Sequence, residues 1–176
     1  MPDEKTTRPT LSDFIEGKLD GSAKQSLLDF IEYCKANKMP IRLSSGYLWG
    51  VYYKGKRVAT IEITVKGVRR GQYTHKDDSW IIGVSYVNFE SNEIENLIKN
   101  ENLSETICAN ITYCKGCLKG CVGNQSQGIT RKIAGKVFNK VCLSGVGFKN
   151  PDVEALDCVK KLMEIRKNHI LESLGK

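Results

Sequence analysis

Residues 58–65 read VATIEITV, and this stretch sets the fold of the chain. Every second side chain in it is apolar: Ala59, Ile61, Ile63 and Val65. A period of two predicts a β-strand with one face in the core. Residues 47–53, rich in aromatic and β-branched side chains, precede it across a Lys54-Gly55-Lys56 turn, and the apolar residues 79–87 follow a polar loop. Three consecutive strands at this spacing predict an antiparallel meander.

Helical patterns flank this meander on both sides. Residues 10–18, 22–36 and 92–100 carry apolar positions at helical spacing. The last helix is predicted to begin with Asn150 as its cap and Pro151 at the first helical position. Residues 137–148 predict a fourth strand. The order of elements predicts an α+β fold, with an antiparallel sheet of about four strands, packed helices and an inserted Cys-rich zinc knuckle.

The composition is that of one globular domain. The chain has 176 residues, of which 40% are hydrophobic and 27% charged, close to the globular average. We expect a flexible tail at residues 1–9 and a single domain over residues 10–176, whose Cys-rich segment spans residues 106–149. No apolar run approaches the roughly 20 residues of a membrane helix, and no signal peptide begins the chain. We therefore expect a cytoplasmic protein without a membrane partner.

Five of the seven cysteines fall within residues 106–149. Three of them form a C-x2-C-x3-C motif, with a glycine before each of the last two: Cys114, Cys117 and Cys121. Two-residue spacing lets one tight turn present two thiolates to a single ion, and the glycines give the backbone the freedom that such a turn needs. Cys142 and Cys108 are the candidates for a fourth ligand. We favour Cys142, because a knuckle closed from the following strand is the usual ribbon-like arrangement, and we expect a structural Zn²⁺ site.

Other interpretations of these cysteines remain open. An iron–sulfur cluster uses the same thiolate ligands, and redox-active thiols or a site without metal are further possibilities. A C-x2-C redox pair normally opens a helix after a strand of a βαβ unit, which this sequence lacks. A disulfide network suits neither the odd number of cysteines nor a reducing compartment. Cys34 and Cys158 lie on apolar helix stripes, so we expect both to pack in the core.

The positive charge is concentrated in the Cys-rich segment. Lys and Arg number 27 against 20 Asp and Glu, which gives a formal net charge of +7. Residues 106–149 contain seven basic residues and no acidic one, so they account for the whole excess. This charge offsets the net negative charge of a Zn²⁺ ion bound by four thiolates. It also attracts nucleic acid or another anionic partner, for which five residues are candidate contacts: Lys115, Lys119, Arg131, Lys132 and Lys136.

Motifs spread over residues 114–167 resemble one protein family. The cysteine motif is followed by Gly135-Lys136-Val137-Phe138-x3-Cys142 and then by Asn150-Pro151-Asp152. This pattern is similar to that of a family of small uncharacterised proteins of low-GC Gram-positive bacteria, which share the cysteine knuckle, a G-K-x-F-x3-C strand and an N-P-D helix start. The resemblance implies that Cys114, Cys117 and Cys142 act together, and it implies no activity.

The sequence favours binding over catalysis. It contains no P-loop, no G-x-S-x-G motif, no H-E-x-x-H motif and no dinucleotide fingerprint, and His75 in the polar loop is expected to be solvated. Our first hypothesis is a non-enzymatic zinc-binding protein whose basic surface contacts nucleic acid. The second is a small-molecule- or protein-binding scaffold, in which strand aromatics such as Trp49, Tyr52 and Trp80 line a concave sheet face instead of packing under the helices. The third is a thiol or iron–sulfur redox protein.

Overall fold

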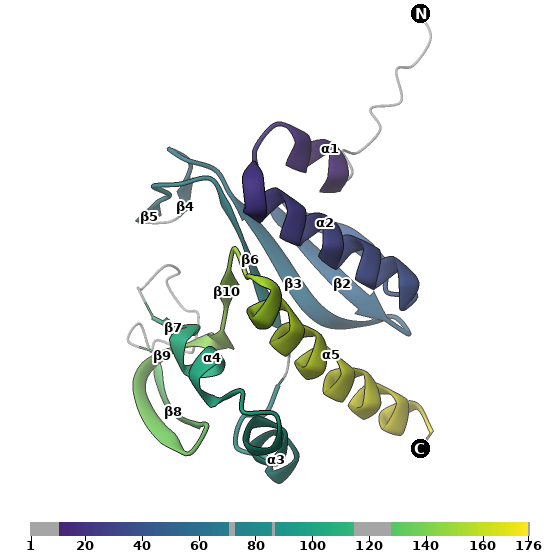
Figure 1. The fold of residues 1–176 in the computed structure, drawn as a ribbon, viewed down its shortest axis with the longest axis vertical. Coiled ribbons are helices and arrows are strands. Elements are labelled where there is room, and N and C mark those ends of the chain that lie inside the picture. Colours follow the sequence, from purple (N-terminus) through teal and green to yellow (C-terminus); the bar gives the residue numbers. More distant parts are fainter. Residues whose placement is uncertain (1–10, 71–72, 86, 115–127, 176) are drawn as a thin grey trace, which may run out of the picture.

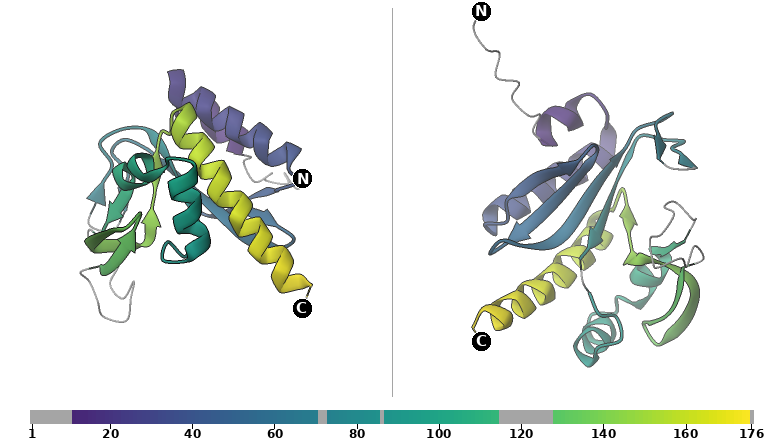
Figure 2. Two further views of the ribbon diagram at one scale, coloured as in Figure 1. Left: turned by 60° about the horizontal axis from the view of Figure 1, so that its bottom comes forward. Right: turned by 180° about the vertical axis from the view of Figure 1, so that it is seen from behind.

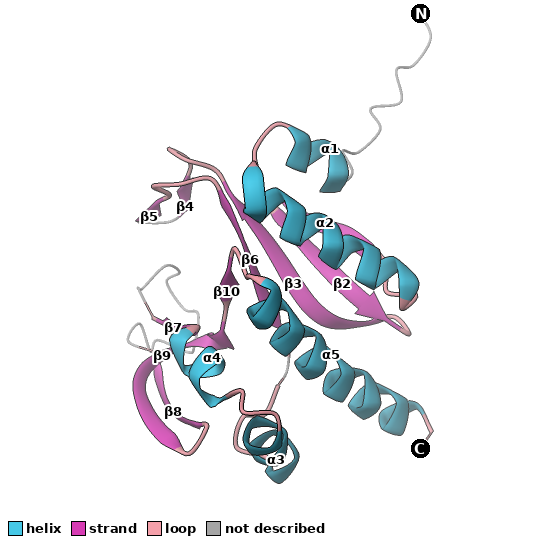
Figure 3. Cartoon of the chain, viewed as in Figure 1, coloured by secondary structure: helices cyan, strands magenta, loops and turns pink. Residues whose placement is uncertain are grey.

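The structure is a computed structural model that describes residues 11–70, 73–85, 87–114 and 128–175. Over these residues the helices are α1 (Leu11–Glu16), α2 (Gly21–Ala36), α3 (Asn92–Asn100), α4 (Ser104–Ala109) and α5 (Val153–Leu174). The strands are β1 (Ile41–Ser45), β2 (Leu48–Tyr53), β3 (Lys56–Thr64), β4 (Arg69–Arg70), β5 (Tyr73–Thr74), β6 (Ser79–Val84), β7 (Ile111–Tyr113), β8 (Ile129–Ile133), β9 (Lys136–Val146) and β10 (Phe148–Lys149). Helices pack against antiparallel sheets (Figure 3), so the predicted α+β class is confirmed.

The largest sheet, which we call the main sheet, has the strand order β1-β2-β3-β6-β10, with every neighbouring pair antiparallel. It contains the predicted meander of β2, β3 and β6, with β1 added at one edge and β10 at the other. Its register aligns a row of apolar residues across all five strands: Leu43, Trp49, Ile61, Ile82 and Phe148. Helices α2 and α5 lie side by side across the face that carries this row (Figure 1).

The core lies between this sheet face and the two helices. Trp49 and Trp80 are both fully buried, and the rings of Trp80 and Phe30 of α2 have their centroids 6.0 Å apart. These tryptophans therefore pack under the helices. Cys34 and Cys158 are fully buried as well, which confirms their prediction as core residues. Burial raises the pKa of each thiol to about 12, so both stay protonated at neutral pH.

A second sheet, which we call the small sheet, has the strand order β7-β9-β8 and lies beside β6 and β10 (Figure 1). The sequence predicts one strand over residues 137–148, which is confirmed as β9 up to Val146 but stops there, before the separate strand β10. β9 pairs with β7 and β8, and only the two residues of β10 pair with β6. Gly147 separates the two strands, because its N–H donates to the Asn110 carbonyl (2.9 Å) at a point where a Cβ would meet Thr112 Oγ1 at 2.8 Å.

Helix α5 begins two residues later than the sequence predicts. Its N-cap is Asp152, whose Oδ1 accepts a hydrogen bond from the Ala155 N–H (2.8 Å). Asn150 instead completes the edge of the main sheet. Its side-chain Oδ1 accepts the Trp80 N–H (2.9 Å), and its own N–H donates to the Trp80 carbonyl (2.8 Å). A residue that bonds the backbone of β6 twice is not available as a helix cap.

Helix α5 spans 22 residues and buries one side against the main sheet. Its Glu164 accepts hydrogen bonds from Tyr33 of α2 (2.7 Å) and from Lys167 (2.8 and 2.9 Å). Burial alone would raise the pKa of Glu164, but these hydrogen bonds and the Lys167 charge outweigh it and hold the pKa below its ordinary value. In the described part of the chain, neither α5 nor any other helix is long and apolar enough to cross a membrane.

Candidate functional site

The small sheet brings two of the four predicted metal ligands to one face. Tyr113 of β7 and Val141 of β9 are direct cross-strand partners, so their side chains share a face. Cys114 and Cys142 each follow one of these residues, and successive strand residues point to opposite faces, so both cysteines lie on the other face. The Cys114 N–H donates to the Lys140 carbonyl (2.6 Å), which continues the ladder to this position. Both thiols are half-buried, and on regular strands diagonal neighbours of this kind lie about 7–8 Å apart.

Gly128 approaches the same place from the third strand. It immediately precedes β8 and has a φ of +74°, a left-handed conformation that favours glycine. A Cβ at this position would lie 2.6 Å from the Lys140 carbonyl carbon and 2.7 Å from Cys114 Cβ. Cys114 and Gly128, the last described residue before segment 115–127 and the first one after it, are therefore in direct contact beside β9. We call these two residues the anchors of that segment.

The predicted ligands Cys117 and Cys121 lie outside the described residues. Within the described ranges, no group of three or more His, Cys, Asp or Glu side chains gathers as a metal site. Cys108, the alternative fourth ligand, is a half-buried residue of α4. It precedes β7, whereas Cys114 follows that strand, so the two cysteines lie at opposite ends of β7. Cys142, which shares a sheet face with Cys114, is the better placed of the two alternatives.

Strand alternation divides the described basic residues of this region between two faces. Ile133 is fully buried, and Arg131, two residues before it on β8, shares its face. Lys136 is the direct cross-strand partner of Ile133. Lys132 lies on the opposite face, and its Nζ is 3.6 Å from a carboxylate oxygen of Glu95 in α3. The three residues predicted to contact nucleic acid together are therefore not on one surface, and Lys115 and Lys119 lie outside the described residues.

The main sheet has a second face, opposite α2 and α5, on which strands β1–β3 look outward with α2 behind them (Figure 2, right). One cross-strand row on it runs through Arg42, Gly50, Thr60 and Gly83. Tyr52, two residues after Gly50, lies on this face with its ring against Gly50. A Cβ at Gly50 would come within 2.7 to 2.9 Å of the Tyr52 atoms Cε2, Oη and Cζ. We call this surface the open face.

Two arginines flank the Tyr52 ring on the open face. The guanidinium carbons of Arg42 and Arg57 lie 5.5 and 5.8 Å from the ring centroid, within the range of cation–π attraction. Arg57 Nη2 also donates to Tyr52 Oη (3.3 Å). The three side chains come from three adjacent strands, since Arg42 is in β1, Tyr52 in β2 and Arg57 in β3. They place two positive charges around one aromatic ring.

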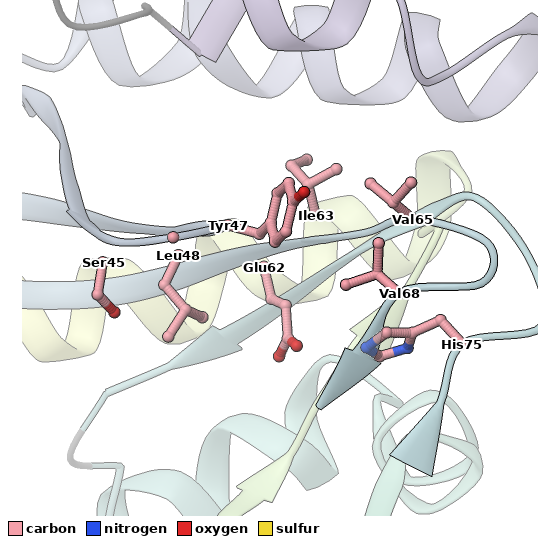
Figure 4. A pocket seen from close by; sticks show the side chains of 9 residues that line it. Ser45, Tyr47, Leu48, Glu62, Ile63, Val65, Val68 and His75 are labelled. Atoms are coloured by element: carbon pink, nitrogen blue, oxygen red, sulfur yellow. The ribbon is translucent and has the colours of Figure 1, made fainter. Parts of the chain in front are cut away.

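A cavity of about 290 Å³ lies at the other end of the open face. Leu48 and Glu62, which are cross-strand partners, point into it on the side away from α2, and His75 reaches toward them from the loop after β5 (Figure 4). Tyr47 and Ile63 line it from the helix side. His75 is thus half-buried at the rim of a cavity, not a fully solvated loop residue as the sequence suggests.

Sequence analysis did not single out Gly128, Arg42 or Arg57. No motif marks Gly128, which is one glycine among 16, and only its approach to Cys114 shows why it is needed. Arg42 belongs to β1, a strand that the sequence analysis missed altogether. The one signal available there was the alternation of Ile41 and Leu43 with Arg42, which places the arginine on the face opposite the core.

Comparison of the chain with protein-family models, with curated proteins and with solved structures finds no match. The resemblance noted from the cysteine, G-K-x-F and N-P-D motifs therefore stays a hypothesis. Function has to be inferred from the residues and from their arrangement.

Proposed function

We propose that this chain is a non-enzymatic zinc-binding protein, in which Cys114, Cys117, Cys121 and Cys142 hold one structural Zn²⁺ ion. The observation that carries the proposal is the β7–β9 register, which puts Cys114 and Cys142 on the same sheet face. Gly128 supports it, because the segment that contains the other two cysteines starts and ends at this face. Four thiolates complete a tetrahedral zinc shell and leave no open position for substrate, which is the chemistry of a structural site.

The proposed ion would fix the segment 115–127 to the small sheet. A metal that joins two residues of this segment to Cys114 and Cys142 restrains the chain between β7 and β8, as a cross-link does. The lysines of the region would offset the negative charge of the four thiolates. No step of catalysis is assigned to the ion.

Metal content of the purified protein tests this proposal. We expect about one Zn per chain in the wild type, and loss of the metal in Cys114→Ser and Cys142→Ser. Cys108→Ser is the matched control, because Cys108 is also half-buried but lies beyond the other end of β7. It should keep its zinc. If Cys142→Ser kept its zinc and Cys108→Ser lost it, Cys108 and not Cys142 would be the fourth zinc ligand.

Two further results would contradict the zinc proposal. Bound iron with a visible absorption band would show an iron–sulfur cluster on the same thiolates. Metal-free protein with unchanged protection of the small sheet would show that the cysteines hold no ion.

A second proposed function is contact with nucleic-acid phosphates through the basic residues of the small sheet. The observation that favours it is that Lys136 is exposed beside the two-residue turn Ala134-Gly135, in a segment without acidic residues. Arg131 shares the Lys136 face, whereas Lys132 is paired with Glu95. Lys136→Ser should weaken binding to duplex DNA or RNA and reduce its salt dependence by the equivalent of about one phosphate contact. Binding that is insensitive to salt, or absent, would contradict this function.

A further inference from the structure

The open face of the main sheet carries a cluster of side chains that the zinc centre does not use. Arg42, Tyr52 and Arg57 come from three adjacent strands, and both guanidinium groups lie within 6 Å of the Tyr52 ring centroid. Arg42 is exposed, and Tyr52 and Arg57 are half-buried, so all three are accessible to a partner. This arrangement places one aromatic ring and two phosphate-binding groups within reach of a single ligand on an uncovered sheet face.

The position of the Tyr52 ring is fixed by its neighbours. Gly50 lets the ring lie down on strand β2, because any larger residue there would occupy the space of ring atoms 2.7 to 2.9 Å away. Arg57 bonds the hydroxyl from β3, and Arg42 approaches the ring from β1. A ring held in this way loses less side-chain entropy when a second planar group stacks on it than a freely rotating tyrosine would.

We propose that the open face binds single-stranded nucleic acid, with a base stacked on Tyr52 and neighbouring phosphates bound by Arg42 and Arg57. Charge complementarity identifies the partner, since both arginines attract phosphate, and the ring between them suits an unpaired base. A duplex keeps its bases stacked on one another and offers no base plane to Tyr52. An apolar peptide could pack on the ring but would leave the two guanidinium groups without an anionic partner. A simple inorganic anion could pair with the guanidinium groups but would not stack on the ring.

The remaining groups on the open face are consistent with one placement of the bound nucleic-acid strand. Thr60 and Gly83, next in the row beside Gly50, are small and allow a close approach to the sheet. The acidic Glu62 lies at the far end, beside the cavity and His75. Lys149 on β10 is paired with Asp77 (3.2 Å). Within the described part of the chain, neither Arg42 nor Arg57 forms an ion pair with a carboxylate, so unneutralised positive charge lies at the Tyr52 end, where the phosphates would bind.

Fluorescence anisotropy with a labelled dT12 or U12 oligonucleotide tests the proposal, because both probes are single-stranded. Tyr52→Leu keeps the bulk but removes the ring, and should weaken binding on the order of tenfold or more, whereas Tyr52→Phe should bind nearly as well as the wild type. Arg42→Ser and Arg57→Ser should each lower the salt slope by about 0.7, the value of one phosphate on a single strand. Gly50→Ala displaces the ring without removing it and should fall between Tyr52→Leu and the wild type. Thermal unfolding of each variant checks that it is folded.

The controls separate this surface from bare charge. Lys35→Ser removes an exposed cation from α2, on the other side of the main sheet, and should leave dT12 and U12 binding unchanged. Failure of the wild type to bind either probe would overturn the proposal. So would equal binding by Tyr52→Leu and wild type, or competition by inorganic polyphosphate as effective as by unlabelled dT12, since both would reduce the surface to an anion site.

Discussion

The main sheet and the small sheet of this molecule differ in the regularity of their strand pairing. The β3–β6 ladder runs without interruption from Ala59 opposite Val84 to Thr64 opposite Ser79, and apolar partners meet on its helix-covered face. Both ladders of the small sheet shift register, between Ile111 and Tyr113 and between Ile129 and Arg131. In the main sheet such shifts are confined to the β1–β2 and β2–β3 ladders, on the β1 side of the sheet. A regular ladder with a buried face is stabilised by burial alone, whereas an irregular one depends on particular turns and close contacts.

The irregularity of the small sheet coincides with the cysteines. Lys140 adopts a positive φ of 60° two residues before Cys142, and Gly128 does so beside Cys114. A left-handed conformation costs a non-glycine residue such as Lys140 free energy, and it persists where the surroundings impose it. Under the zinc proposal, we therefore expect the main sheet to stay folded without the ion and the small sheet to lose stability when the ion is removed.

Removal of zinc should give the largest difference between the two sheets. Structural zinc is worth roughly 10–16 kcal/mol in small peptides, more than any single side chain in this core. After chelation, amide hydrogen exchange should lose protection in β8 and β9 and keep it in β3 and β6. If chelation left the hydrogen-exchange protection of both sheets unchanged, the proposed dependence of the small sheet on zinc would be contradicted.

Gly128→Ala should have the next largest effect. The substitution combines a positive φ with contacts of 2.6 and 2.7 Å to Lys140 and Cys114, so we expect a loss of about 2–3 kcal/mol in the small sheet. Gly135→Ala is the matched control in the same sheet, because its φ of +76° is similar but nothing lies within 4 Å. It should cost only about 1 kcal/mol. Denaturant unfolding with zinc quantification would measure both, and equal losses would contradict the packing role of Gly128.

A matched pair of valines sharpens the comparison further. Val51 in the main sheet and Val141 in the small sheet are both 0% exposed. Val51→Ala should lower the free energy of global unfolding by about 1.5–2.5 kcal/mol, because two buried methyl groups are lost and a cavity remains. Val141→Ala should mainly reduce the exchange protection of β7 and β9. The reverse pattern would show that the small sheet, not the main sheet, limits global stability.

The smallest expected effect concerns pH and lies on the main-sheet side. Because the folded state lowers the pKa of Glu164, its ionised form contributes stability above the ordinary carboxylate pKa, and this contribution disappears as pH falls from about 5 toward 3. Glu164→Gln should therefore be less stable than wild type at pH 7, by less than about 1 kcal/mol since the site is partly exposed, and the gap should close in acid. Glu172→Gln, an exposed substitution on the same helix, is the control. A gap that stays constant from pH 7 to pH 3 would refute the role of ionisation.

The sequence predicts the main sheet well because its signals are local. Alternation over residues 58–65, the turn at Lys54 and Gly55, and the helical spacing of α2 and α3 each involve neighbouring residues, and all of them are confirmed. β1 was missed because Ile41–Ser45 is short, polar at one end and at the edge of the sheet. The cap of α5 was misplaced because Asn150 bonds β6, a partner 70 positions away in the sequence.

The small sheet and the candidate sites were harder to predict, because they depend on pairings across the chain. Residues 137–148 have a single uninterrupted strand pattern, and nothing local shows that β9 turns to β7 and β8 while β10 alone joins β6. The C-x2-C-x3-C spacing predicts a metal site, but the placement of Cys142 on the same sheet face as Cys114 follows only from the β7–β9 register. The clustering of Arg42, Tyr52 and Arg57 likewise needs the pairing of three strands.

The contact between Cys114 and Gly128 has a consequence for how this protein tolerates change. Because the chain departs and returns at the same spot, the distance between these two anchors does not depend on how many residues connect them. Doubling the length of a flexible connection with fixed ends costs only about 0.6 kcal/mol. Insertions between the anchors that keep the four cysteines should therefore leave both sheets intact, and this makes the junction a natural place to attach a fluorescent tag or an affinity peptide.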